Sequence, residues 1–139
     1  MISNRARILL AAAIVLTPSA GRQSLSMLDG TWHGTSICTS VGKPACHDEV
    51  VVYYTRLRDT SKSTSSPLRL DWTANKIVAG KEESMGGFVC DVQADRRSAI
   101  CPMRDWRWSF TVRGDTMAGT LVNPAGTVWR NIRAVRDKW

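Results

Sequence analysis

Short stretches in which apolar and polar residues alternate make up most of the chain after residue 28. The clearest alternation covers residues 106–112, with one apolar face formed by Trp106, Trp108, Phe110 and Val112. A period of two is the pattern of a β-strand that buries one face. The 3.6-residue period of an amphipathic helix does not stand out in this part of the chain, so the pattern predicts an all-β domain.

Turn-forming residues separate the predicted strands. Gly and Pro permit or preset the backbone angles that a chain reversal needs, and Asn, Asp and Ser also favour turns. Such residues mark hairpin ends at 95–96, 114–115 and 123–126, a polar loop at 59–66 that Pro67 ends, and bends at Gly80, Gly86 and Gly87. The strands predicted between these breaks cover residues 30–37, 48–57, 68–72, 76–85, 88–92, 98–101, 106–112, 117–122 and 127–136.

These segments amount to eight or nine antiparallel strands joined by short turns. A meander of this kind leaves unpaired edges unless it stacks as two sheets or closes on itself. An eight-stranded closed barrel has an interior just wide enough for side chains or for one small ligand. We therefore expect a single antiparallel up-and-down β-barrel, with a β-sandwich as the second choice.

The first 21 residues follow a different pattern. Arg5 and Arg7 precede an apolar run at residues 8–16, and small residues follow that run. Basic, apolar and small-residue regions in this order form a secretory signal peptide, and the run is shorter than the roughly 20 residues that span a bilayer. We predict that residues 1–21 are removed and that residues 22–139 form the exported domain, periplasmic or extracellular. The alternative is an apolar N-terminal helix packed on the domain.

The positive charge is modest once this segment is gone. The full chain has 19 Lys+Arg against 12 Asp+Glu, a formal net charge of +7. Residues 1–21 contain two Arg and no acid, which leaves 17 against 12, or +5. The basic residues do not form the stripe, interleaved with aromatic residues, that is typical of nucleic-acid binding. We expect no nucleic-acid partner and no membrane span in the mature chain.

Four cysteines in a small exported domain predict two disulfides. Cys38 and Cys46 flank a short loop, and Cys90 and Cys101 flank the hairpin whose tip is at residues 95–96. Pairing each couple closes one local hairpin, a geometry that a direct cross-strand pair satisfies. The sequence therefore favours the bonds 38–46 and 90–101.

The first predicted strand contains Gly30 and Trp32, and the last contains Arg130 and Arg133. These ends resemble the opening and closing strands of the lipocalin and wider calycin group. In that group Gly-x-Trp places an indole across the barrel floor and a late Arg lies over it. The resemblance implies a lipocalin-like barrel in which Arg130 or Arg133 covers Trp32. Such stacking contributes about 0.5–2 kcal/mol, so its role is structural.

The stretch from about residue 28 to 136 also resembles small exported bacterial proteins of uncharacterised function. The resembling segments are residues 34–38, 45–53, 75–78 and 114–116. This resemblance implies export and a lipocalin-like barrel, and it carries no known activity.

Residue types that support catalysis or metal binding are few. His47, Asp48 and Glu49 form the densest polar cluster, but neighbours on a strand point to opposite faces and no nucleophile accompanies them. His33 follows Trp32, so it points outward if Trp32 points inward. A zinc site made from the cysteines with His33 and His47 lacks closely spaced ligand pairs. We expect no catalytic residue, no metal and no cofactor.

The large aromatic residues are the remaining candidates for a ligand site. We expect five of them inside the barrel, where they either line a pocket or fill it: Tyr54, Trp72, Trp106, Trp108 and Phe110. The first hypothesis is a non-enzymatic binding protein that holds a small hydrophobic or aromatic ligand at one barrel mouth. The second is a protein-binding module, such as an inhibitor of a secreted or periplasmic hydrolase, whose probe is the loop with Lys43 and Pro44 at its tip.

Overall fold

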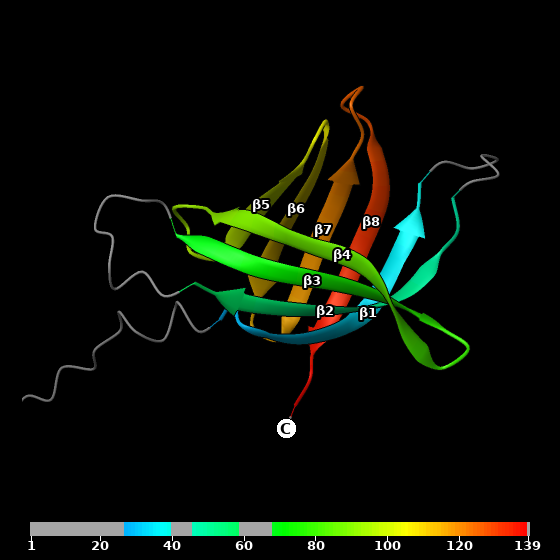
Figure 1. Ribbon diagram of the computed structural model, residues 1–139. Helices are drawn as coiled ribbons and strands as arrows, with labels where there is room; N and C mark the ends of the chain where they lie inside the picture. The colour runs from blue at the N-terminus through cyan, green and yellow to red at the C-terminus, as the bar shows by residue number, and fades with distance from the viewer. Residues whose placement is uncertain (1–26, 40–45, 59–67, 139) are drawn as a thin grey trace, which may run out of the picture.

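The chain forms eight β-strands in a computed structural model that describes residues 27–39, 46–58 and 68–138 (Figure 1). The strands are β1 Gly30–Cys38, β2 Glu49–Leu57, β3 Arg69–Val78, β4 Lys81–Val92, β5 Ser98–Met103, β6 Trp106–Arg113, β7 Thr116–Val122 and β8 Val128–Arg136. Strands with one buried face account for this architecture, and the alternation of buried and exposed side chains is clearest in β3, β6 and β8.

Every strand pairs antiparallel with its neighbours in the chain, and β1 also pairs with β8. The β1–β8 register runs from Trp32 opposite Arg136 to Cys38 opposite Arg130. This last pairing closes the sheet, so the predicted up-and-down barrel is confirmed and the β-sandwich is wrong. Pairing of β1 with β8 means that neither the first nor the last strand is an exposed edge.

The β3–β4 hairpin differs from the prediction. The predicted strands at 68–72 and 76–85 have the wrong extents, because β3 continues to Val78 and the chain reverses at Ala79 and Gly80. Both turn residues have positive φ, 49° and 77°, as a tight two-residue hairpin turn requires. Gly86, at φ 117°, lies within β4 beside a shift of register in the opposite strand. The predicted bend at this glycine is therefore a bulge inside one long strand.

The barrel core follows the predicted alternation. Arg69 and Asp71 are exposed, whereas Leu70 and Trp72 between them are buried. On β6, Phe110 and Val112 are buried and Arg113 is exposed. The largest fully buried side chains come from strands on several sides of the barrel and from the segment before β1: Trp32, Tyr53, Leu70, Met117 and Ile132 from strands, and Leu28 from that segment.

Both predicted disulfides are present. Cys38 bonds to Cys46 and Cys90 bonds to Cys101. The second bond lies in the core and joins β4 to β5, whose ladder contains only two residue pairs, Asp91–Ile100 and Val92–Ala99. Covalent attachment therefore supplements the shortest hydrogen-bonded seam of the barrel.

Some predicted features fall outside the described residues. These are the signal peptide, the polar loop at 59–66 and the loop tip at Lys43 and Pro44. Within the three described ranges, no helix is long and apolar enough to cross a membrane.

Candidate functional site

The barrel floor is built around Trp32. Its indole is fully buried, and Nε1 donates a hydrogen bond of 3.0 Å to Thr55 Oγ1. The guanidinium of Arg136 lies over the ring, with Cζ 4.2 Å from the centroid, and donates to the carbonyl oxygens of Asp29 and Met27. The indole–guanidinium floor that the resemblance implies is therefore present in this barrel.

The arginine that covers Trp32 was predicted wrongly as Arg130 or Arg133. Register explains the difference, because Arg136 lies opposite Trp32 and Arg130 lies opposite Cys38, near the other end of the barrel. Arg133 is exposed, because alternation places it on the outer face between the buried Ile132 and Ala134.

Aromatic side chains pack against one another in the middle of the barrel. Trp72 has its ring centroid 4.8 Å from that of Tyr53, 4.2 Å from that of Phe110 and 6.1 Å from that of Trp108. Tyr53 also meets Trp108, with centroids 6.2 Å apart. The structure thus brings together three predicted site residues, Trp72, Trp108 and Phe110, as a packed layer. Edge-to-face contacts of this kind stabilise a core beyond the area they bury.

The predicted placement of Tyr54 inside the barrel is wrong. Tyr54 is 39% exposed on the outer face, where its hydroxyl donates to Glu82 Oε1 at 2.8 Å. Asn75 donates to the same carboxylate at 2.7 Å. The inward tyrosine is its neighbour Tyr53, which lies in register with Trp32 on β1. The alternation of Val51, Tyr53 and Thr55 is the signal that identifies it.

Three polar residues meet inside the barrel near the end opposite the floor. Arg130 Nη1 donates to the carbonyl and hydroxyl oxygens of Ser36, each at 3.2 Å, and lies 3.5 Å from Glu49 Oε2. The side chains of Arg130 and Glu49 are only 12% and 25% exposed. Because both charges are largely shielded from water, removing either one would leave the other uncompensated and would strongly destabilise the fold.

Two hydrogen-bond donors beside this cluster have no acceptor. Tyr53 Oη and Trp108 Nε1 are both buried, and neither has a partner among the described residues at hydrogen-bonding distance and angle. The Ser36 hydroxyl lies near Tyr53 Oη, but it falls outside those limits. Burial, and then the negative charge of Glu49, raise the pKa of the Tyr53 phenol, while Arg130 and Ser36 act in the opposite direction. The phenol is therefore a proton donor at neutral pH, and an unsatisfied buried donor of this kind calls for an explanation.

A tryptophan pair lies at the same end of the barrel. Trp106 and Trp129 are half-buried, with ring centroids 5.8 Å apart in an edge-to-face arrangement. They come from the starts of β6 and β8, beside the turns at the top of Figure 1. We call the region formed by Glu49, Trp106, Trp129 and Arg130, which borders Trp108 of the packed aromatic layer, the barrel mouth.

The histidines and their acidic neighbours separate as expected. His33 lies on the outer face with Nε2 2.8 Å from Asp137 Oδ2. His47 is exposed, Asp48 Oδ1 accepts a hydrogen bond from the backbone N–H of Cys38, and Glu49 contributes to the mouth. No group of three His, Cys, Asp or Glu side chains able to hold a metal occurs among the described residues.

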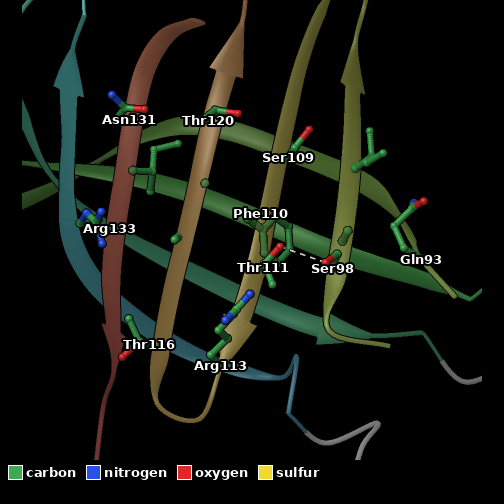
Figure 2. A pocket seen from close by; sticks show the side chains of 15 residues that line it. Gln93, Ser98, Ser109, Phe110, Thr111, Arg113, Thr116, Thr120, Asn131 and Arg133 are labelled. Carbon is green, nitrogen blue, oxygen red and sulfur yellow. Dashed lines mark hydrogen bonds between the residues drawn. The ribbon is translucent and has the colours of Figure 1, made fainter. Parts of the chain in front are cut away.

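Two hollows lie on the outside of the barrel. One, of about 860 Å³, is on the outer face of β5 to β8 (Figure 2), and the other, of about 680 Å³, is on the outer face of β1 to β3 near the floor. The second is lined by charges of both signs, including Asp71 and Arg136, and Asp71 also forms an ion pair with Arg58 at 2.8 Å. No tryptophan lines either hollow.

Comparison with known proteins adds no family to this description. The chain matches no protein-family model, and no curated protein matches it. The described residues establish a closed eight-stranded antiparallel barrel, an architecture compatible with a lipocalin-like fold.

Proposed function

We propose that the protein is an exported, non-enzymatic binding protein that holds a small aromatic or apolar ligand at the barrel mouth. A hydrogen-bond acceptor on the ligand faces Tyr53 and Trp108. The observation that carries the proposal is the pair of buried donors, Tyr53 Oη and Trp108 Nε1, which have no acceptor among the described residues.

Leaving these two buried donors without an acceptor costs free energy, and a ligand that supplies an acceptor removes that cost. A buried donor without a partner costs about 1–3 kcal/mol, and most buried polar groups in proteins are satisfied. A carbonyl or carboxylate oxygen accepts from both a phenol O–H and an indole N–H. Bound at the mouth, a ligand with such an oxygen recovers this loss, whereas a pure hydrocarbon does not.

The surroundings favour a ligand with an apolar body. The packed aromatic layer, which includes Trp72, Trp108 and Phe110, lies on the inner side of the mouth. Trp106 and Trp129 lie at the rim of the mouth. Ligand sites commonly combine apolar and aromatic walls with a few placed polar groups. Because Glu49 already balances the charge of Arg130, both neutral and anionic acceptors fit.

Export is part of the proposal. Two disulfides persist in oxidising compartments, and four cysteines in a chain of this size are typical of exported domains. The predicted signal peptide and the resemblance to small exported bacterial proteins support the same location.

The test uses matched ligands and intrinsic tryptophan emission. The panel contains 4-phenylbutyrate, octanoate and aromatic ketones, together with the acceptor-free counterpart butylbenzene. We expect the acceptor-bearing members to change the emission, and Tyr53→Phe and Trp108→Phe each to weaken their binding by about tenfold, which is the worth of one hydrogen bond. Tyr53→Phe removes only a hydroxyl and changes packing little. Trp108→Phe also removes part of a packed indole, so urea unfolding must first show that this variant is folded.

Tyr54→Phe is the matched control, because it removes a hydroxyl from the outer face one residue away. It should bind the panel as the unmodified protein does. If no panel member changes the emission of the folded protein, the proposal fails and the protein-binding module becomes the leading hypothesis. If butylbenzene binds as well as 4-phenylbutyrate in every variant, Tyr53 and Trp108 do not donate hydrogen bonds to the ligand.

A further inference from the structure

The outer face of β5 to β8 has a groove with a distinct chemistry. The groove is the hollow of about 860 Å³ described above, which we call the outer groove (Figure 2). Two cross-strand rows of mostly small outward side chains form its floor: Ser98, Thr111 and Ala118, then Ile100, Ser109 and Thr120. Longer side chains, among them Gln93, Arg113 and Arg133, stand around this floor, so the surface is hollowed there.

The charge of the outer groove is entirely positive. Arg113 and Arg133 line it, and none of its lining residues is an acid. Neither guanidinium forms an ion pair with any residue in the described ranges. The two arginines lie two strands apart, on β6 and β8, which separates their backbones by about 10 Å or more. They are placed to contact two different anionic groups of one ligand.

Hydroxyl and amide groups line the outer groove beside the arginines and beyond them. Ser109, Thr111, Thr116 and Thr120 contribute hydroxyls, and Asn131 contributes an amide. Each of these side chains both donates and accepts hydrogen bonds. A ligand rich in hydroxyl groups finds partners of both kinds here, whereas an apolar ligand does not.

Hydrogen bonds hold one side of the groove floor in place. Ser98 Oγ lies 2.9 Å from Thr111 Oγ1 and 2.7 Å from Asp95 Oδ2. Asp95 is outside the lining residues, and it accepts further bonds from the backbone N–H groups of Arg97 and Ser98, which lower the pKa of its carboxyl. This acid is therefore occupied within the β4–β5 turn rather than paired with Arg113 or Arg133.

We propose that the outer groove binds an acidic oligosaccharide, a short sugar chain whose carboxylates contact Arg113 and Arg133. Guanidinium groups bind carboxylates in a bidentate, charge-assisted manner, and the hydroxyl-lined floor matches sugar hydroxyls. A peptide fits less well, because extended peptides add to a sheet edge or place side chains in apolar pockets. The outer groove lies on the face of four paired strands rather than at a sheet edge, and Ile100 is the main apolar side chain on the groove floor.

The experiment is calorimetric titration with a short galacturonate oligomer and with its fully methyl-esterified form. The two share the same sugar chain and differ in charge. We expect the free acid to bind, the ester to bind at least about tenfold more weakly, and added salt to weaken binding of the acid. Arg113→Gln and Arg133→Gln should each lower the affinity for the free acid by about tenfold. Both side chains are exposed, so neither change disturbs the core.

Arg107→Gln is the matched control, because Arg107 is exposed on β6 and lies outside the groove lining. It should leave the affinity unchanged, whereas Ala118→Trp, which fills the groove floor, should abolish binding. The proposal would be overturned if the acid and the ester bound equally well. It would also be overturned if Arg107→Gln lowered the affinity for the acid as much as Arg113→Gln and Arg133→Gln do. Tighter binding of tetraglutamate than of the galacturonate oligomer would assign the groove to an acidic peptide instead. If the folded protein does not bind the galacturonate oligomer at all, the oligosaccharide proposal is also overturned. None of these results tests ligand binding at the barrel mouth.

Discussion

At the residue scale, neighbouring side chains of similar type have different roles because they point to different faces. Tyr53 packs inside the barrel with an unpaired hydroxyl, and Tyr54 donates to Glu82 on the outside. Arg133 and Arg136 differ in the same way, since one lines the outer groove and the other covers Trp32. One position along a strand is enough to move a side chain from core to solvent.

Arg136→Ala should destabilise the barrel by about 2–3 kcal/mol. The change removes a desolvated cation–π contact with Trp32 and hydrogen bonds to the carbonyl oxygens of Asp29 and Met27. Urea unfolding followed by tryptophan emission measures the loss. Arg133→Ala is the control and should change stability by less than about 0.5 kcal/mol. Equal effects of the two variants would mean that the stacking contributes nothing.

Both tyrosines should resist ionisation in alkaline solution. The hydrogen bond to Glu82 raises the pKa of Tyr54, and burial raises that of Tyr53. Because folding favours the neutral phenols, the associated stability is complete below the unfolded pKa of about 10 and is lost as the pH rises through the folded values. Tyrosinate absorbance near pH 10 should therefore be lower in the folded protein than in guanidinium, where free tyrosine is about half ionised.

Variants assign the two titrations. Tyr53→Phe keeps only the exposed Tyr54, and its tyrosinate should appear at a lower pH than that of the other variant. Tyr54→Phe keeps only the buried Tyr53 and should show almost no tyrosinate until the barrel unfolds. If the tyrosine left in Tyr54→Phe titrates with an ordinary pKa while the protein stays folded, Tyr53 is not buried as described.

At the element scale, the pairings between neighbouring strands differ in what stabilises them. The β3–β4 pairing continues along both long strands, whereas β4 and β5 share two residue pairs and a disulfide. The sequence predicted the disulfide from its hairpin, but the shortness of this ladder follows from the divergence of β4 and β5 in three dimensions. In Figure 1, β3 and β4 run across the barrel while β5 and β6 rise away from them.

Removing the Cys90–Cys101 bond should cost more than removing the Cys38–Cys46 bond. Chain entropy gives a similar contribution, about 3 kcal/mol, for sequence separations of 11 and 8 residues. Cys90 and Cys101 are also buried in the core, so replacing both with Ala adds roughly 1–2 kcal/mol of lost packing. Urea unfolding of the two double Ala variants makes the comparison, and a greater loss from the Cys38 and Cys46 variant would contradict it.

At the scale of the whole molecule, the barrel combines a sealed floor, a packed middle and a polar mouth. Leu28 and Trp32 seal the floor, and Thr55 Oγ1 donates to the carbonyl oxygen of Leu28 at 2.5 Å. Asp29 Oδ1 accepts a hydrogen bond from the backbone N–H of Leu57. The segment just before β1 is therefore part of the folded domain.

This arrangement predicts how far the N-terminus can be shortened. A chain that starts at residue 22, after the predicted signal peptide, should retain the barrel with its full stability. A chain that starts at residue 30 loses the buried Leu28 and the Asp29 contacts, and we expect it to be less stable by at least about 3 kcal/mol. Urea unfolding of both chains provides the measurement, and equal stability would show that residues 28 and 29 do not seal the floor.

The sequence by itself determined the features that depend on local pattern. Alternation along single strands predicted the all-β class, the buried positions of Leu70, Trp72 and Phe110 and the outward position of His33. Hairpin spacing predicted both disulfides. These results required no knowledge of which distant strands pair, because a period of two and a short turn are properties of neighbouring residues.

Only the tertiary structure decided the features that depend on register across the closed sheet. The pairing of β1 with β8 places Arg136, rather than Arg130, at Trp32 and brings Arg130 to Ser36 and Glu49. The registers of three consecutive hairpins, β5–β6, β6–β7 and β7–β8, likewise align the small outward side chains that form the outer groove. Register between the first and last strands is set by how the whole barrel closes, and a local pattern contains no information about that choice.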